Sequence, residues 1–325
     1  MIISKKFFVA SLAMIAAAGI APAAQAQYAG GPEVTVLQGF KAGGGSDALA
    51  QLVQPYLAKE LGTDMVNQYI PGATGAIAWT RLAKQTQADG KTISITNTPM
   101  LMTNYIMNKA ITYNIDELEP LANVVTDPGI IVVAKDSKYK TVQDLFADAK
   151  ANPGKLTVGN SGVGGDDYFS TIMLEKASGL SFQKVPFQGD GPSWQAAMGG
   201  KIDASFNNLG ITFPQIKAGN LRPLAIFTEE RVADLPDVPT LKELGIDVVA
   251  GSSRGYSAPK GIPAEARTQF LAAMKKVAAN PDFQRDAKAR AMVLDVKLGD
   301  DYKSYLEKQQ VQFTAIWEEI KDSVK

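Results

Sequence analysis

Short β-rich runs alternate with helical patterns along most of the chain, and this order restricts the possible folds more than any other feature of the sequence. Such spacing favours mainly parallel strands connected by helices, which is the α/β class. Expected strands are 34–37, 65–69, 92–96, 130–134, 156–159, 182–185, 202–206, 224–227 and 248–249, and expected helices are 48–61, 76–84, 101–107 and 167–177. Pro55 should kink or shorten the first of these helices.

The C-terminal part of the chain differs from the rest. Helical patterns at 263–278, 281–289 and 300–320 follow one another there with little strand signal. A chain of 325 residues is long enough for two domains, although no Gly/Ser-rich or Pro-rich linker separates two parts of it. We therefore expect the chain to cross between domains near 127–129 and near 251–253. This places 27–128 and 252–325 in domain I and 129–251 in domain II.

The N-terminus has the layout of a secretory signal peptide. Lys5 and Lys6 precede an uncharged apolar run at 7–20, and small residues follow at 24–26. The run is shorter than the ~20 residues that cross a bilayer, so a cleaved signal is favoured over an uncleaved anchor. Cleavage after Ala26 would remove a signal peptide at 1–26 and release a periplasmic protein.

The chain contains no cysteine and no histidine. Their absence excludes disulfides, thiolate nucleophiles, Ser-His and Cys-His dyads and zinc sites of the Cys/His type. The 33 Lys and Arg balance 33 Asp and Glu, so no basic surplus is present for a nucleic-acid backbone, and no nucleic-acid partner is expected. No cofactor and no bound metal are expected either.

Two glycine-rich turns, at 39–47 and 159–167, each stand between an expected strand and an expected helix. Glycine lets the backbone approach a ligand closely, and the following helix N-terminus offers free N–H groups and a positive dipole end. Such a turn can bind an anion without a cationic side chain. Neither turn has the complete P-loop or dinucleotide pattern. Tight strand–helix connections that bind nothing are the alternative.

Polar residues near the expected strand ends are further candidates. Asp166 and Asp167 could form a metal site or an acid/base pair, or could cap the following helix. Arg254 lies among small residues and could form a bidentate pair with a carboxylate or an exposed salt bridge. Asn97 and Asn207 end two strands where α/β sheets place ligands, or they belong to ordinary loops.

Several motifs occur in the order that one known family shows. They are Phe-x-x-Gly-Gly-Gly-Ser-Asp at 40–47, Pro-Gly-Ala-Thr-Gly at 71–75, Gly-Val-Gly-Gly-Asp-Asp at 162–167, Val-Pro-Phe-Gln-Gly at 185–189 and Leu-Pro-Asp-Val-Pro-Thr at 235–240. From 34 to about 317, the chain resembles the extracytoplasmic solute receptors of tripartite tricarboxylate transporters, also called Bug receptors. The resemblance implies a two-domain α/β fold of the periplasmic-binding-protein (Venus flytrap) type, with the ligand in an interdomain cleft that closes about a hinge.

The resemblance also implies how the ligand is held. Family members bind a ligand carboxylate between the two glycine loops, mainly through backbone N–H groups and ordered water. With Asn97, Asn207 and Arg254 added from their positions in the sequence, the expected ligand-binding residues are Phe40, Gly44, Gly45, Ser46, Asp47, Thr74, Asn97, Ser161, Gly164, Gly165, Asp166, Asp167, Asn207 and Arg254. The chain would then be a monomeric receptor, not an enzyme, that delivers a small organic carboxylate to membrane permease subunits.

Some positions depart from the family pattern. Lys41-Ala42 replaces the usual Pro-Pro, Tyr168 stands where many members have His, and Thr74 replaces a common glycine. The particular ligand is therefore not implied. Arg254-Gly255 is similar to a subgroup that takes di- and tricarboxylates, which favours a ligand with more than one acidic group.

Two other functions stay open from the sequence. One is an exported hydrolase or lyase with Asp166 or Asp167 as base and Ser46 or Ser161 as nucleophile. Without histidine, such an enzyme would need Lys or a metal to activate the serine. The other is a receptor that uses the same pocket to present its ligand to a sensor.

Overall fold

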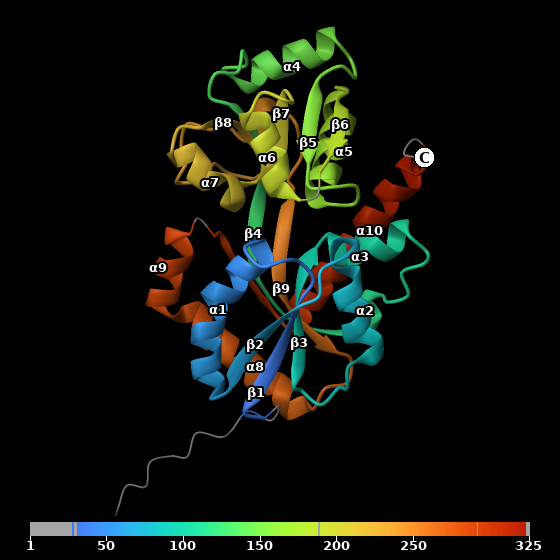
Figure 1. Ribbon diagram of the computed structural model, residues 1–325, viewed down its shortest axis with the longest axis vertical. Coiled ribbons are helices and arrows are strands. Elements are labelled where there is room, and N and C mark those ends of the chain that lie inside the picture. The colour runs from blue at the N-terminus through green and yellow to red at the C-terminus, as the bar shows by residue number, and fades with distance from the viewer. Residues whose placement is uncertain (1–27, 29–30, 188, 291, 323–325) are drawn as a thin grey trace, which may run out of the picture.

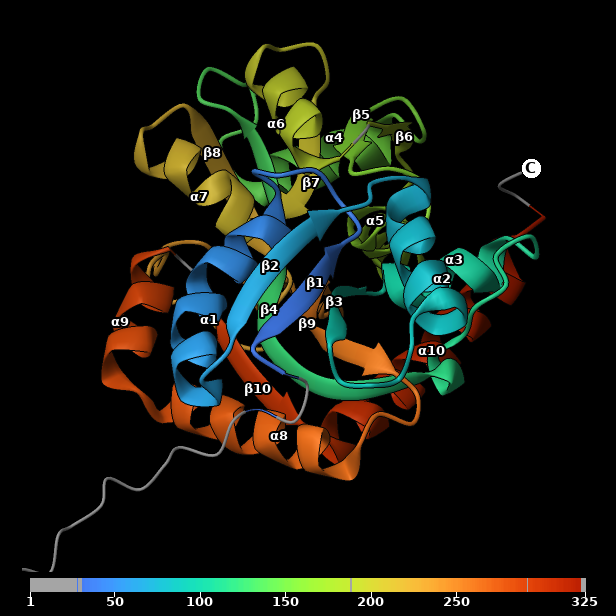
Figure 2. The same cartoon turned by 60° about the horizontal axis from the view of Figure 1, so that its bottom comes forward.

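The computed structural model describes residues 28, 31–187, 189–290 and 292–322 of the chain. The predicted signal peptide at 1–26 and its cleavage site lie outside these residues. The described part has a mixed α/β architecture with a curled, ten-stranded sheet covered by helices, as Figures 1 and 2 show. None of the described helices is both long and apolar enough to cross a membrane.

The strands and helices follow the predicted alternation over most of the chain. The strands are β1 Glu33–Gln38, β2 Asp64–Tyr69, β3 Thr92–Thr98, β4 Leu118–Ala134, β5 Thr157–Asn160, β6 Gln183–Pro186, β7 Ala204–Asn208, β8 Leu221–Ile226, β9 Gly251–Pro259 and β10 Leu294–Leu298. The helices are α1 Gly45–Leu61, α2 Ala76–Gln85, α3 Met100–Met107, α4 Val142–Ala151, α5 Asp166–Ser178, α6 Asp190–Met198, α7 Leu209–Lys217, α8 Ala264–Ala279, α9 Pro281–Ala289 and α10 Asp300–Ile320.

The first lobe is built on strands in the order β2-β1-β3-β9-β4, with β10 also paired to β4. Side chains alternate between the two faces of these strands. Val34 and Val36 therefore pack in one core with α1, α8 and α9, whereas Leu37 packs in another with α2, α3 and α10. Figure 2 shows these two groups of helices on opposite sides of the sheet.

The second lobe contains β5, β6, β7 and β8 together with α4 to α7 and the last part of β4. β5 pairs parallel with β6 and β7, while β4 pairs antiparallel with β7 and β8. Its largest apolar core includes Leu145 of α4, Leu174 of α5 and Phe206 of β7. A separate cluster gathers around Leu209 at the start of α7.

β4 and β9 run side by side between the lobes (Figure 1). The first part of β4, up to Pro128, pairs with β9, and from Gly129 onward β4 pairs with β7 and β8. The two strands form the covalent connection between the lobes.

The structure corrects several predicted elements. α1 continues through Pro55 without a break. Residues 248–249 are not a strand, and β9 begins only at Gly251. The apolar side chain of Val248 instead packs from a loop into the second-lobe core. β10 lies where helices alone were expected, and it forms by pairing with β4. β4 itself begins at Leu118, twelve residues before the predicted strand.

Candidate functional site

A buried ion pair joins the two connecting strands. Nη1 of Arg254 in β9 donates to Oδ2 of Asp127 in β4 at 3.0 Å, and the two side chains are 7% and 9% exposed. Asp127 Oδ1 accepts a hydrogen bond of 2.8 Å from the backbone N–H of Gly210, in the first turn of α7. The alternative of an exposed salt bridge at Arg254 is therefore wrong.

The guanidinium also connects β4 and β9 to α5 through one amide side chain. Nη2 of Arg254 donates to Oδ1 of Asn208 at 3.1 Å, and Nδ2 of Asn208 donates to Oδ2 of Asp166 at 2.7 Å. Asn208 is the N-terminal cap residue of α7, and Asp166 begins α5. Two helix N-termini of the second lobe thus meet at the arginine.

The N-terminus of α1 reaches the same arginine from the first lobe. A Cβ on Gly45 would lie 2.7 Å from Arg254 Nε, so only glycine allows this approach. The next residue, Ser46, donates from Oγ to Oδ1 of Asn97 at 3.0 Å, which ties α1 to the end of β3. Three helix N-termini, of α1, α5 and α7, therefore surround one buried cation, and their partial positive ends favour an anion.

Asp47 stabilises the first glycine loop. Its Oδ2 accepts hydrogen bonds from the N–H of Gly43 and from Gln51, and its Oδ1 accepts one of 2.6 Å from Tyr69. Burial raises the pKa of Asp47, but the hydrogen bonds from Tyr69, Gly43 and Gln51 outweigh burial and hold the pKa below its ordinary value. The carboxylate therefore holds the loop in shape, and both of its oxygens already accept hydrogen bonds from the protein.

The second glycine loop contacts the first lobe directly. The carbonyl of Gly164 accepts a hydrogen bond of 2.8 Å from Thr103 Oγ1 in α3, and Gly164 has a positive φ of 87°. Gly165 allows close packing, because a Cβ there would lie 2.6 Å from Ser161 Oγ. The Ser161 hydroxyl is buried and has no hydrogen-bond partner among the described residues.

Asp166 and Asp167 do not cap α5 with their side chains. Burial, followed by the charge of Asp190, raises the pKa of Asp166 to about 6, while Asn208 and Arg254 oppose that rise. Burial and the charges of Asp166 and Asp190 raise the pKa of Asp167 well above its ordinary value. Within the described residues, no group of three or more acids is placed to hold a metal ion.

Replacing Asp166 by Asn should make stability depend less on pH between about 4 and 6. A buried carboxyl whose folded-state pKa exceeds its unfolded value stabilises the fold at low pH, and this contribution is lost as pH rises through 6. The wild type should lose up to about 1.4 kcal/mol per pH unit from this group. Urea unfolding of both chains at pH 4, 5, 6 and 7 measures the difference, and parallel stability profiles would contradict the expectation.

The comparison with known proteins identifies the family. Residues 49–321 match the family described as "Tripartite tricarboxylate transporter family receptor". The chain belongs to this family. Its receptors are periplasmic solute-binding proteins, which agrees with the resemblance found in the sequence.

The receptor is similar to several known proteins. It is 33% identical over 285 residues to the "UPF0065 protein in gbd 5'region" of Cupriavidus necator, covering 83% of this chain and 85% of the other. The structure of R. palustris Rpa4515 with adipate has a TM-score of 0.82 at 25% identity and covers 88% and 96% of the two chains. MatC from Rhodopseudomonas palustris with bound malate has a TM-score of 0.75 at 25% identity and covers 89% and 98%. These neighbours place the receptor in the two-domain solute-binding fold.

Two predicted residues lie at the edge of the site, towards α2 and α3 of the receptor. Phe40 packs edge-to-face on Trp79, with ring centroids 6.3 Å apart. Thr74 is exposed, has a positive φ of 52°, and accepts a hydrogen bond of 3.1 Å on its carbonyl from Asn104. Neither contact involves Arg254 or its hydrogen-bond partners.

Sequence reasoning missed three residues that organise the receptor's site. Asp127 was noted only as a chain crossing, Thr103 was not considered, and Asn208 was passed over in favour of its neighbour. Asn207 instead donates to the backbone carbonyl of Asp190 at 3.1 Å. Because neighbouring residues of a strand point to opposite faces, only one of two adjacent asparagines can reach the arginine. The sequence shows the pair Asn207-Asn208, but it does not show which of the two side chains faces the arginine.

The space beside Arg254 is small in the receptor. A cavity of about 40 Å³ is lined there by residues that include Gly45, Asp127, Gly210 and Arg254. One buried water needs roughly 10–15 Å³, whereas small-molecule pockets usually measure roughly 300–1,000 Å³. The cavity is therefore large enough for water and much smaller than a typical small-molecule pocket.

Proposed function

We propose that the receptor captures a small organic carboxylate with two or three acidic groups and delivers it to the permease subunits of a tripartite tricarboxylate transporter. The observation that carries this proposal is the convergence of the α1, α5 and α7 N-termini on buried Arg254. The printed names of two structural neighbours supply the ligand class, since adipate and malate are both dicarboxylates. Export through a signal peptide cleaved after Ala26, and action as a monomer, are parts of the same proposal.

The ligand would lie between the two glycine loops. Gly44, Gly45 and Ser46 lie on one lobe, and Ser161 with Gly164 and Gly165 lies on the other. Backbone N–H groups at the N-termini of α1 and α5 would donate to the carboxylate oxygens, and the helix dipoles would favour the negative charge. Each lobe supplies part of the donor set, so the closed form binds best and its population rises with ligand concentration.

The proposed hinge lies where β4 and β9 pass between the lobes. Domain I would comprise 27–128 and 252–325, and domain II would comprise 129–251. Pro128 and Gly129 stand where β4 changes its pairing partner, and Gly251 pairs with Pro128 across the two strands. A rotation at these positions would separate the loops without breaking either lobe's sheet.

A thermal-shift and calorimetric screen with mono-, di- and tricarboxylates tests the proposed function. We expect malate, adipate or another diacid to raise Tm and to bind at a one-to-one ratio, while the matching monoacids bind at least tenfold more weakly. Ligand recovered unchanged after incubation agrees with a receptor. Conversion of a carboxylate ester or hydroxy acid into product would instead support the hydrolase or lyase alternative.

Replacing Gly164 by Val should weaken diacid binding at least 100-fold. The positive φ of 87° strains a β-branched residue by about 1–2 kcal/mol, and a Cβ would lie 3.2 Å from Met107 Sδ across the lobe contact. Gly154→Val is the matched control, since Gly154 has a φ of 70° in the turn before β5 and touches only its own lobe. Diacid affinity of Gly164→Val within twofold of wild type would refute this loop's role.

A further inference from the structure

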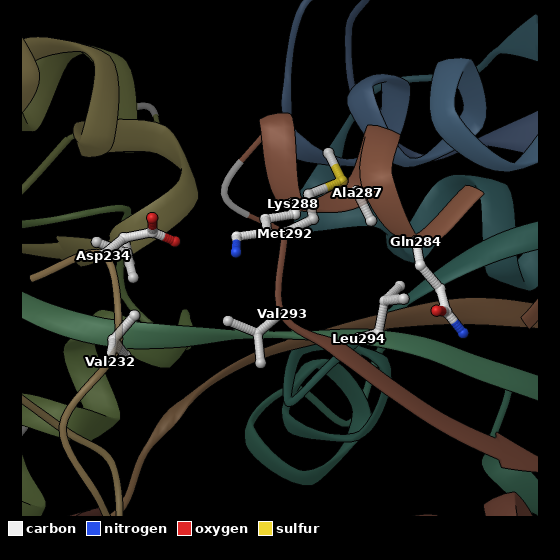
Figure 3. Close-up of a pocket in the computed structure, with 9 residues that line it drawn as sticks. Val232, Asp234, Gln284, Ala287, Lys288, Met292, Val293 and Leu294 are labelled. Carbon is white, nitrogen blue, oxygen red and sulfur yellow. The ribbon is translucent and has the colours of Figure 1, made fainter. Parts of the chain in front are cut away.

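A cavity of about 240 Å³ lies on one flank of the junction between the lobes. Met292, Val293 and Leu294 line it from the first lobe and Val232 lines it from the second, so its walls are largely apolar. Lys288 and Asp234 extend toward one another from opposite walls (Figure 3). None of the residues predicted to bind the transported ligand lines this cavity, which we call the flank chamber.

The flank chamber adjoins the small cavity beside the buried arginine. Met292 and Val293 line both cavities, while Gly45 and Arg254 line only the inner one. Lys288 lines the outer cavity and Arg254 lines the inner one. The pair of cavities therefore has a largely apolar outer end and an inner end that is lined by a cation.

Arg254 offers a buried donor at that inner end. Its Nη1 and Nη2 are bonded to Asp127 and Asn208, but Nε is buried and has no partner in the part of the chain that the structure describes. Nε faces the first residue of α1, as the 2.7 Å distance to a Cβ on Gly45 shows. Buried polar groups in native proteins are nearly always hydrogen-bonded. An acceptor in the inner cavity would meet this need.

The charged side chains that line the two cavities sum to one positive charge. Lys288, Arg290 and Arg254 contribute positive charges, and Asp127 and Asp234 contribute negative ones. Asp166 and Asp190 lie outside this lining, and their negative charges also act on Arg254. The N-termini of α1 and α7 border the inner cavity through Gly45 and Gly210, and their dipoles add to the positive potential.

We infer that the flank chamber and the inner cavity form a second binding site, for a carboxylate that carries an apolar body. The carboxylate accepts a hydrogen bond from Arg254 Nε, and the apolar body fills the flank chamber. An apolar cavity of about 150 Å³ is enough for benzene in another protein, so 240 Å³ accommodates a ring of that size.

An occupant of this site touches both lobes. The occupant therefore stabilises the arrangement in which the lobes are close together. It should raise the receptor's affinity for the transported ligand, and the transported ligand should raise the affinity for the occupant by the same factor. This coupling rests on the proposed function, whereas the existence of the second site does not.

Fluorine NMR titration of the mature chain with 4-fluorobenzoate tests the inference. We expect saturable binding, and we expect Val293→Trp to weaken it at least tenfold because the indole fills the chamber. Val311→Trp is the matched control, since Val311 is 71% exposed on α10 and should bind the probe as wild type does. The uncharged analogue 4-fluorobenzamide should bind the unaltered chain at least tenfold more weakly, a comparison that stands even if Val293→Trp does not fold.

Gly164→Val separates this site from the cleft between the glycine loops. The variant should lose less affinity for 4-fluorobenzoate than for the diacid, because Gly164 lines neither cavity. A loss of 4-fluorobenzoate affinity in Gly164→Val as large as its loss of diacid affinity, wild-type binding by Val293→Trp, or equal binding of the acid and the amide would each overturn the second site, as would no binding at all. Failure of every diacid to bind wild type would reject only the proposed function.

Discussion

Replacing Asp127 by Ala should lower the free energy of unfolding by about 3–5 kcal/mol. The substitution leaves the Arg254 guanidinium buried with its counter-ion removed, and it also removes the acceptor of the Gly210 N–H. A buried charge without its partner is far more costly than a surface pair that is broken, because water cannot replace the lost interaction. Urea unfolding followed by circular dichroism measures the change.

Two further chains show whether the ion pair is the cause. Glu307→Ala removes an exposed partner of Lys303 on α10, and we expect it to cost less than about 0.5 kcal/mol. The double variant Asp127→Leu with Arg254→Met removes both charges and should recover most of the stability lost by Asp127→Ala. A cost below about 1 kcal/mol for Asp127→Ala, or no recovery in the double variant, would contradict a buried, mutually dependent pair.

The order of strands and helices could be predicted because its signals are local. Val34 and Val36 alternate with polar residues, Gly62 ends α1 in the left-handed conformation with a φ of 64°, and Thr141 with Asp144 forms a capping box before α4. Each of these features depends on residues only a few positions apart, so the sequence displays them directly.

The connecting strands could not be predicted in the same way. β9 reads Gly-Ser-Ser-Arg-Gly over its first half, a composition with little intrinsic preference for a strand. It forms because β3 and β4 bond to it on both sides. β10 likewise exists through its pairing with β4. Partners that are more than a hundred residues away leave no periodic pattern in the segment itself.

The residues of the candidate site likewise fall into those that the sequence predicted and one that depends on the pairing of distant strands. Gly45, Ser46, Asn97 and Arg254 were all predicted, and the structure brings them together at the junction. The partner of Arg254 was not, because Asp127 lies 127 positions away and its carboxylate meets the guanidinium only through the pairing of β4 with β9. A glycine loop in the sequence indicates a possible ligand contact, but the side chains that position the loop come from other parts of the fold.

Replacing Phe169 by Ala should shift the receptor towards an open form and weaken diacid binding at least 100-fold. Phe169 belongs to α5 of the second lobe, yet it is only 1% exposed and packs within the first-lobe cluster that contains Leu101, Met102 and Ile106. Its ring meets that of Phe313 edge-to-face, with centroids 5.1 Å apart. Phe→Ala in a core costs about 3–5 kcal/mol. Here we expect the cost to fall on the closed form. In the open form the ring of Phe169 would have left its first-lobe partners, so its removal would cost little there.

Small-angle X-ray scattering and calorimetry with the same diacid measure the two parts of this prediction. The radius of gyration of ligand-free Phe169→Ala should exceed that of wild type, and its affinity should fall because less of the protein is competent to bind. Phe283→Ala is the matched control, since Phe283 is fully buried against Tyr56 inside the first lobe. It should lose comparable stability and keep the wild-type radius and affinity. If Phe169→Ala behaves like Phe283→Ala in both measurements, the ring is ordinary core packing, and closure must be driven by the ligand and the polar junction alone.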